Sequence, residues 1–100
     1  MLLNHDKQVN ASLQILPLEE SEKALQAIDK AIDSIQQSGI AHLVCPFETV
    51  LEGRFAEVQQ VMETAIEAAL SISDELVIHC KWHISKKANL SIHQKIDKFR

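Results

Sequence analysis

The chain is poor in the residues that mark several specialised classes of protein. Its 100 residues include two cysteines, two prolines, two glycines, one tryptophan and no tyrosine. Two cysteines are too few for a disulfide framework, and the low proline and glycine content leaves no low-complexity linker. Because the first residues also lack the pattern of a secretory leader, we expect the protein in the cytoplasm.

Long apolar runs and an excess of positive charge are also missing. No run of apolar residues approaches the roughly 20 that a helix needs to cross a bilayer. Acidic residues number 14 against 10 basic ones, which gives a formal net charge of -4. A mildly acidic chain has no general attraction for a phosphate backbone. We therefore expect neither a membrane nor a nucleic acid as partner.

What the chain does contain is the composition of an ordinary globular protein. Hydrophobic residues make up 46% of the sequence and charged residues 24%. A chain of this length buries about two thirds of the surface that its unfolded form exposes, so it folds without disulfides. We expect a single domain over residues 1–100.

Hydrophobic periodicity predicts one strand and two long helices. Residues 9–15 alternate apolar and polar side chains, which is the period of a strand with one buried face. Apolar residues at steps of three and four predict a helix over residues 22–37, ended by Gly39. The same spacing predicts a second helix that begins near Phe55 and ends near residues 71–73.

Three further strands and a short helix complete the pattern. Residues 40–53 hold two β-rich runs on either side of Pro46, which lacks a backbone N–H for a central ladder and so marks the turn. Residues 76–84 alternate in polarity and predict the last strand. Ser91 and Gln94 form a capping-box pattern that begins a final short helix, which we expect to dock on the body.

The resulting order of elements is that of an α+β, ferredoxin-like fold. It is βαββαβ, a four-stranded antiparallel sheet with two helices on one face, followed by a short C-terminal helix. In the usual strand order the first and third strands lie side by side in the middle. The other face is uncovered, and we expect it to carry Leu16, Leu51 or Trp82. A monomer rarely exposes so much apolar area, so we also expect self-association.

Several motifs stand at spacings typical of one known family. Residues 12–17 read Ser-Leu-Gln-Ile-Leu-Pro, residues 38–40 read Ser-Gly-Ile, and residues 46–53 read Pro-x-x-Thr-x-Leu-Glu-Gly. Residues 95–100 close the chain with Lys-x-x-Lys-x-Arg, in which Phe99 precedes the arginine. Over nearly its whole length, the chain resembles the thiamine-binding protein family, whose members are small ferredoxin-like proteins.

This resemblance implies a small-molecule ligand and no catalysis. Members of the family assemble as dimers or tetramers and bind thiamine or its hydroxymethylpyrimidine part, with no other cofactor. Carried to the matching positions, the resemblance implies these ligand-binding residues: Ser12, Gln14, Thr49, Glu52 and Lys81. Cys45, Phe47 and Trp82 depart from the residues usual in the family, and these departures bear on the ligand more than on the fold.

The chemistry of these side chains suits an aminopyrimidine. Its ring nitrogens and exocyclic amine can pair with the carboxylate of Glu52, the amide of Gln14 and the hydroxyls of Ser12 and Thr49. The cationic thiazolium of thiamine would be favoured by an acidic protein and by the face of Trp82. Thr49 and Glu52 have opposite strand parity, so both reach one pocket only if the strand ends or bulges beside them.

Each predicted site residue also has a structural interpretation. Ser12 and Gln14 suit the solvated face of a half-buried strand, and Glu52 suits an acid that complements the dipole at a helix start. Lys81 suits a surface lysine in an ion pair, and Trp82 suits packing in the core or at an interface.

A metal site is the strongest rival pattern. His79, Cys80 and His83 are residue types that bind zinc or copper. On a strand at ~3.3 Å per residue the two histidines lie about 13 Å apart, and the cysteine points to the other face. Cys45 has no basic neighbour or helix start that would activate it as a nucleophile. We expect neither a metal site nor an enzyme.

Two functions therefore compete. The favoured one is a non-catalytic cytoplasmic binding protein for thiamine or a hydroxymethylpyrimidine-like precursor, acting as an oligomeric carrier or sensor. The alternative is a structural or regulatory protein-interaction module with no small-molecule ligand. A binding protein gains stability by mass action when thiamine is added, and an interaction module does not.

Overall fold

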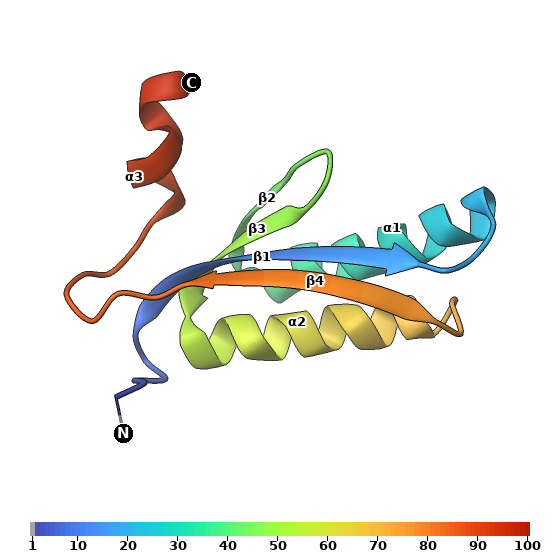
Figure 1. Ribbon diagram of the computed structural model, residues 1–100, viewed down its shortest axis with the longest axis horizontal. Helices are drawn as coiled ribbons and strands as arrows, with labels where there is room; N and C mark the ends of the chain where they lie inside the picture. Colours follow the sequence, from blue (N-terminus) through green and yellow to red (C-terminus); the bar gives the residue numbers. More distant parts are fainter. Residues whose placement is uncertain (1) are drawn as a thin grey trace.

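Four antiparallel strands form one sheet in the computed structural model, which describes residues 2–100. The strands are β1 (Gln8–Pro17), β2 (Ala41–Val44), β3 (Thr49–Arg54) and β4 (Leu76–His83). Their order across the sheet is β2-β3-β1-β4 (Figure 1). The first and third strands lie side by side in the middle, which confirms the predicted ferredoxin-like topology.

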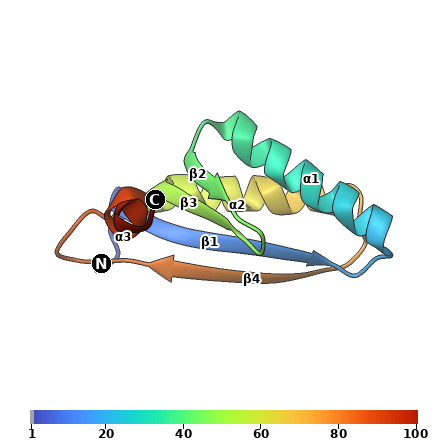
Figure 2. The same cartoon turned by 90° about the horizontal axis from the view of Figure 1, so that it is seen from above.

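Two long helices cover one face of this sheet. Helix α1 spans Ser21–Ser38 and α2 spans Phe55–Leu70, and both lie on the same side of the strands (Figure 2). Gly39 ends α1 with a φ of 77°, a left-handed conformation that glycine adopts at little steric cost. Within residues 2–100 no helix is both long and apolar enough to cross a membrane.

The core lies between the sheet and these helices, and strand register decides which side chains enter it. Ala11 of β1 stands opposite Leu51 of β3 and Trp82 of β4. Leu51 is fully buried, and Trp82 packs against the core with its ring 4.7 Å from that of Phe55. The expectation that Leu51 or Trp82 lies on the open face is wrong, because both are paired with Ala11, whose side chain faces the helices.

Among residues 2–100, no helix packs flat against the opposite face of the sheet (Figure 2). Along β1 it carries Asn10, Ser12, Gln14 and Leu16, which alternate with the core residues. Leu16 is 38% exposed, as expected for this face. The sheet therefore offers a surface that mixes polar and apolar side chains.

After β4 the chain turns back and bonds to the start of β1. The backbone N–H of Leu90 donates to the carbonyl of Gln8 at 3.4 Å, and the Gln8 side chain donates to the carbonyl of Leu90 at 2.7 Å. The side chain of Asn89 accepts a hydrogen bond from the Gln8 N–H at 3.3 Å. These contacts fix the point from which the last residues leave the sheet.

The C-terminal residues form an arm that projects from the body (Figure 1). It consists of α3 (Ile92–Ile96) and a 3-10 turn (Asp97–Phe99), and the predicted capping box of Ser91 and Gln94 is present. Neither element contains a buried residue, and Phe99 is 74% exposed. The expectation that this helix docks on the body of its own chain is wrong, because the arm is held at its base, Ile92 and Ile96 are only half-buried and Phe99 stays exposed.

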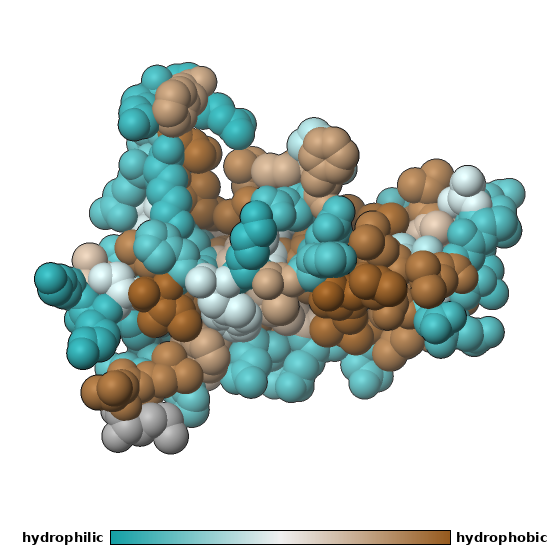
Figure 3. Space-filling model, viewed as in Figure 1, coloured by the Kyte–Doolittle hydropathy of each residue, from teal (hydrophilic) through white to brown (hydrophobic). Residues whose placement is uncertain are grey.

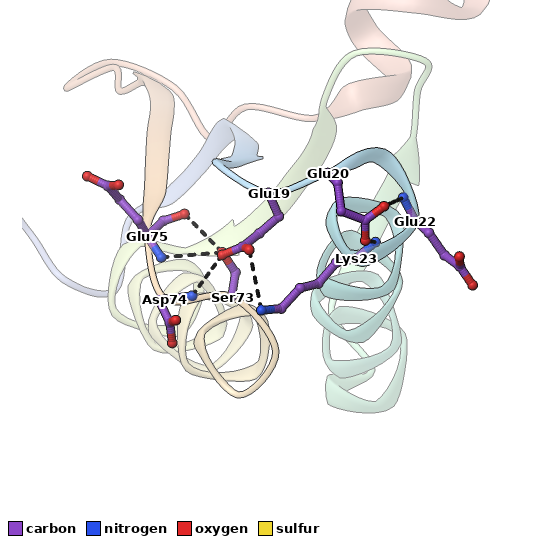
Figure 4. A network of polar contacts seen from close by, with 7 residues as sticks. All are labelled: Glu19, Glu20, Glu22, Lys23, Ser73, Asp74 and Glu75. Atoms are coloured by element: carbon purple, nitrogen blue, oxygen red, sulfur yellow. Dashed lines mark hydrogen bonds and ion pairs between the residues drawn. The ribbon is translucent and has the colours of Figure 1, made fainter.

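At the far end of the sheet, a carboxylate joins the loop after β1 to the loop before β4 (Figure 4). Glu19 accepts hydrogen bonds from the Ser73 hydroxyl at 3.0 Å and from the Asp74 backbone N–H at 3.1 Å. Lys23 Nζ lies 3.3 Å from the other carboxylate oxygen. The Ser73 hydrogen bond above all, then that of Asp74, holds the pKa of Glu19 below its usual range.

Candidate functional site

Four of the five predicted site residues share the open face of the sheet. Ser12 of β1 pairs with Lys81 of β4 and with Val50 of β3. Gln14 and Glu52 each stand two residues from a member of this row, so their side chains point to the same side. Ser12 and Lys81 are thus neighbours through direct strand pairing.

Thr49 lies on the other face. It pairs with Leu13, whose side chain is in the core, and it is 6% exposed. The ladder between β1 and β3 is continuous from Thr49 to Arg54, so no bulge reverses the parity of Glu52. Thr49 and Glu52 therefore do not point into one pocket.

Glu52 has a structural partner on the open face. Its Oε1 accepts a hydrogen bond from the backbone N–H of Ile92, at 2.6 Å. Ile92 is the first residue of α3, so the carboxylate complements the start of this helix and holds the base of the arm. The helix-start interpretation of Glu52 concerned the helix that follows it in sequence, α2, whereas its contact is with the start of α3. Its part in ligand binding stays a prediction.

A first cavity of about 300 Å³ lies beside the loop of the β2–β3 hairpin, and we call it the hairpin cavity. Its apolar walls include residues of α1 and of the loop, namely Ile28, Ile32, Ile35 and Phe47. Its polar lining includes Gln14, Glu48 and Thr49. The cavity occupies the place where β1 continues beyond its last pairing with β3, at Leu13.

A second cavity of about 490 Å³ lies over the open face, between the sheet and the C-terminal arm, and we call it the open-face cavity. Its polar and charged lining comes from the sheet, the hairpin and the arm: Asn10, Ser12, Glu48, Lys81, His83, Lys95 and Arg100. Leu43, Val50, Ile92 and Ile96 give it an apolar part. Its charged groups are mostly basic, although the chain as a whole is acidic.

The two cavities divide the predicted site residues between them. Gln14 and Thr49 line the hairpin cavity, and Ser12 and Lys81 line the open-face cavity. Glu52 lines neither. The five residues therefore do not form one site within a single chain.

Sequence reasoning missed most of the residues that line these cavities, among them Asn10, Glu48 and Lys95. Asn10 is 4% exposed and its Oδ1 has no hydrogen-bond partner in the described chain. Its strand parity, which matches that of Ser12, is the signal that would have included it. Glu48 lines both cavities from the hairpin loop, and Lys95 reaches the open-face cavity from α3. No local pattern marks these two, because the arm and the hairpin meet only in three dimensions.

The histidines of β4 lie on the open face, and Cys80 lies on the other. This follows from pairing of His79 with Gln14 and of Cys80 with Leu13. Within residues 2–100 no three His, Cys, Asp or Glu side chains gather as a metal site would require. His83 instead has Lys95 as its neighbour, with 2.7 Å between Nδ1 and Nζ.

Comparison with known sequences gives relatives over most of the chain. The thiamine-binding protein family matches residues 11–100. A UPF0045 protein of Clostridium perfringens is 30% identical over 91 residues, which cover 91% of this chain and 96% of that protein.

Solved structures share the fold. A domain of unknown function from Bacillus cereus is similar with a TM-score of 0.88 and 29% identity, over 98% of this chain and 96% of that one. A candidate thiamine biosynthesis/salvage protein of Thermotoga maritima has a TM-score of 0.84 and 25% identity, over 93% and 99%. Fold and cavities thus define a small ferredoxin-like protein with room for small ligands. The chain belongs to the thiamine-binding protein family.

Proposed function

We propose that the protein binds thiamine or its hydroxymethylpyrimidine part without catalysis, and that the hairpin cavity holds this ligand. Membership of the thiamine-binding family is the observation that carries the proposal. The cavity adds support, since its volume of about 300 Å³ suits a small organic molecule. The Thermotoga maritima neighbour, a candidate thiamine biosynthesis/salvage protein, supports a role linked to the same vitamin.

The charge of the hairpin cavity favours a cationic ligand. Glu48 lines it, and no lysine, arginine or histidine does among the described residues. The thiazolium ring of thiamine carries a positive charge, which the basic side chains of the open-face cavity would repel. Phe47 is 82% exposed at the hairpin, where its ring offers a face to a cation. Trp82 is not proposed for this part, because its ring packs on Phe55.

The polar groups of the hairpin cavity suit the aminopyrimidine part. The Thr49 hydroxyl donates or accepts one hydrogen bond, and the Gln14 amide offers both a donor and an acceptor. Residues 14–17 of β1 extend beyond the pairing with β3, so backbone groups on that edge add further donors and acceptors. Isoleucines of α1 cover the faces of the ring.

We further propose that the protein works in the cytoplasm as an oligomeric carrier or sensor, a dimer or a tetramer. The space-filling view of the open face shows an apolar patch over the paired ends of β1 and β4 (Figure 3). Three of its residues have large exposed fractions: Leu16 38%, Leu18 53% and Val77 41%. Burying such a patch against a second copy removes apolar area from water, which supports self-association.

Isothermal titration of the full chain with thiamine, and separately with hydroxymethylpyrimidine, tests the proposed site. We expect saturable binding of at least one of them. Thr49→Val keeps the shape of the side chain and removes its hydroxyl, so we expect affinity to fall by about fivefold, the loss of one hydrogen bond. Glu48→Gln should weaken binding of thiamine more than binding of the neutral hydroxymethylpyrimidine.

Matched controls are available on the exposed side of α2. Thr64→Val removes a hydroxyl that donates to the Gln60 carbonyl, and Glu63→Gln removes an exposed carboxylate. Both variants should bind as the parent does. Equal affinity of Thr49→Val, Glu48→Gln and the parent would place the ligand elsewhere. A folded parent that binds neither compound would favour the interaction module.

A further inference from the structure

The open-face cavity gathers positive charge in an acidic protein. The chain has a net charge of -4, yet Lys81, Lys95 and Arg100 line this one cavity and Glu48 is the carboxylate that faces them. The basic residues come from two places, β4 and the C-terminal arm. Their convergence is produced by the path of residues 84–91, which returns the chain to the start of β1.

These basic groups form no ion pairs within the described chain. The ion pairs within residues 2–100 involve Lys23, Arg54 and His93, and none involves a basic residue of this cavity. Lys95 Nζ lies 2.7 Å from Nδ1 of His83. A lysine ammonium carries three N–H donors, so this one contact leaves donors of Lys95 available. The cavity thus presents N–H donors that lack an acidic partner.

Asn10 supplies a second and independent sign of a ligand. It lines the cavity and is 4% exposed, and its Oδ1 is a buried acceptor with no partner among residues 2–100. Its amide nitrogen makes one long contact, at 3.5 Å, with the carbonyl of Leu90. A buried acceptor left unpaired costs about 1–3 kcal/mol. A ligand that brings a donor to Oδ1 would remove this cost.

We propose that the open-face cavity binds a small phosphate monoester whose organic part carries an amine donor. Lys81, Lys95 and Arg100 hold the phosphate oxygens by charge-assisted hydrogen bonds, and Asn10 Oδ1 accepts from the amine. Val50 and Ile96 cover the organic part. The cavity of about 490 Å³ is larger than a bare phosphate needs, which supports a ligand with an organic part. The site stands apart from the thiamine proposal, because the side chains that bind the ligand differ and their charge is opposite, although Glu48 lines both cavities.

Titration calorimetry at low salt tests this proposal with three probes. They are hydroxymethylpyrimidine phosphate, methyl phosphate and hydroxymethylpyrimidine. We expect the first to bind most tightly, and methyl phosphate to bind at least about fivefold more weakly because it has no donor for Asn10. Lys81→Met and Lys95→Met should each weaken the phosphate monoester about tenfold or more. Lys30→Met, which removes an exposed lysine of α1, is the matched control and should have no effect.

The outcomes separate this site from the hairpin cavity. Binding of the phosphate monoester should persist in Thr49→Val and in the presence of saturating thiamine. Absence of saturable heat with the monoester, or unchanged affinity in both lysine variants, would overturn the proposal. Equal affinity for hydroxymethylpyrimidine phosphate and methyl phosphate would overturn the role given to Asn10. Failure of thiamine to bind would leave the phosphate result intact, because the two titrations report different residues.

Discussion

The two faces of the sheet differ in chemistry, although every strand contributes to both in alternation. On the covered face Val9 and Leu51 are fully buried in the core. Their sequence neighbours Asn10 and Glu52 lie on the open face, where Asn10 donates to the carbonyl of Leu90 and Glu52 accepts from the N–H of Ile92 at the base of the arm. A shift of one residue along a strand therefore exchanges a core position for a polar surface position.

The two cavities also differ from each other, in this case in the charge of their lining. The hairpin cavity opens beside the covered face and its ionisable lining includes the acid Glu48. The open-face cavity shares Glu48 and adds Lys81, Lys95 and Arg100, so its basic groups outnumber the acid. The two cavities therefore differ in the charge that they present to a ligand. The experiments below test how far the two faces differ in packing and in assembly.

The largest expected effect comes from Leu51 on the covered face. Leu51→Ala removes a fully buried side chain, so the free energy of unfolding should fall by about 2–5 kcal/mol. Val50→Ala, one residue away on the open face, should cost about 1 kcal/mol or less. Urea unfolding followed by circular dichroism measures both values. Similar losses in the two variants would show that the open face is as tightly packed as the core.

An intermediate effect, on the assembly of the protein, is expected from the apolar part of the open face. Leu16→Asn combined with Val77→Asn makes the patch over β1 and β4 polar, and sedimentation velocity measures the molecular mass. The parent should sediment as a dimer or tetramer and the double variant as a single chain. Lys30→Met on α1 serves as the control and should keep the parent mass. An unchanged assembly in the double variant would move the interface away from this patch.

The smallest expected effect is a dependence of stability on acid pH. The pKa of Glu19 is lowered in the folded protein, so its stabilisation is present above the unfolded glutamate pKa of about 4.3. It is lost as the pH falls through the lower pKa of the folded state. Thermal melts should show a smaller loss of Tm from about pH 5 to pH 3 in Glu19→Gln than in the parent. Glu22→Gln, an exposed neighbour, should follow the parent, and parallel profiles of Glu19→Gln and parent would contradict the linkage.

Most of the fold was predictable from local pattern. Helix α1 was predicted over 22–37 and spans Ser21–Ser38, and the last strand was predicted over 76–84 and spans Leu76–His83. Helical and strand periods differ, and Gly39 and Pro46 interrupt them where the chain turns. These signals act over a few residues, so the sequence carries them without any knowledge of packing.

The faces of the strands were less predictable. Val50 and Leu51 are both apolar, so alternation does not decide which of them is buried, and pairing of Leu51 with Ala11 does. Trp82 is turned inward by the same pairing. No sequence pattern predicted that the arm projects from the body either, because its apolar residues have the spacing of a helix that docks.

The sequence by itself determined the elements, their order and the family, because periodicity, turn residues and motif spacing are local properties of the chain. Only the tertiary structure decided that no bulge brings Thr49 and Glu52 to one face, and that Lys81 and Lys95 line one cavity with Asn10. Those relations depend on strand register and on the return of the chain after β4. Both are set by hydrogen bonds between residues far apart in sequence, such as that of Glu52 with Ile92.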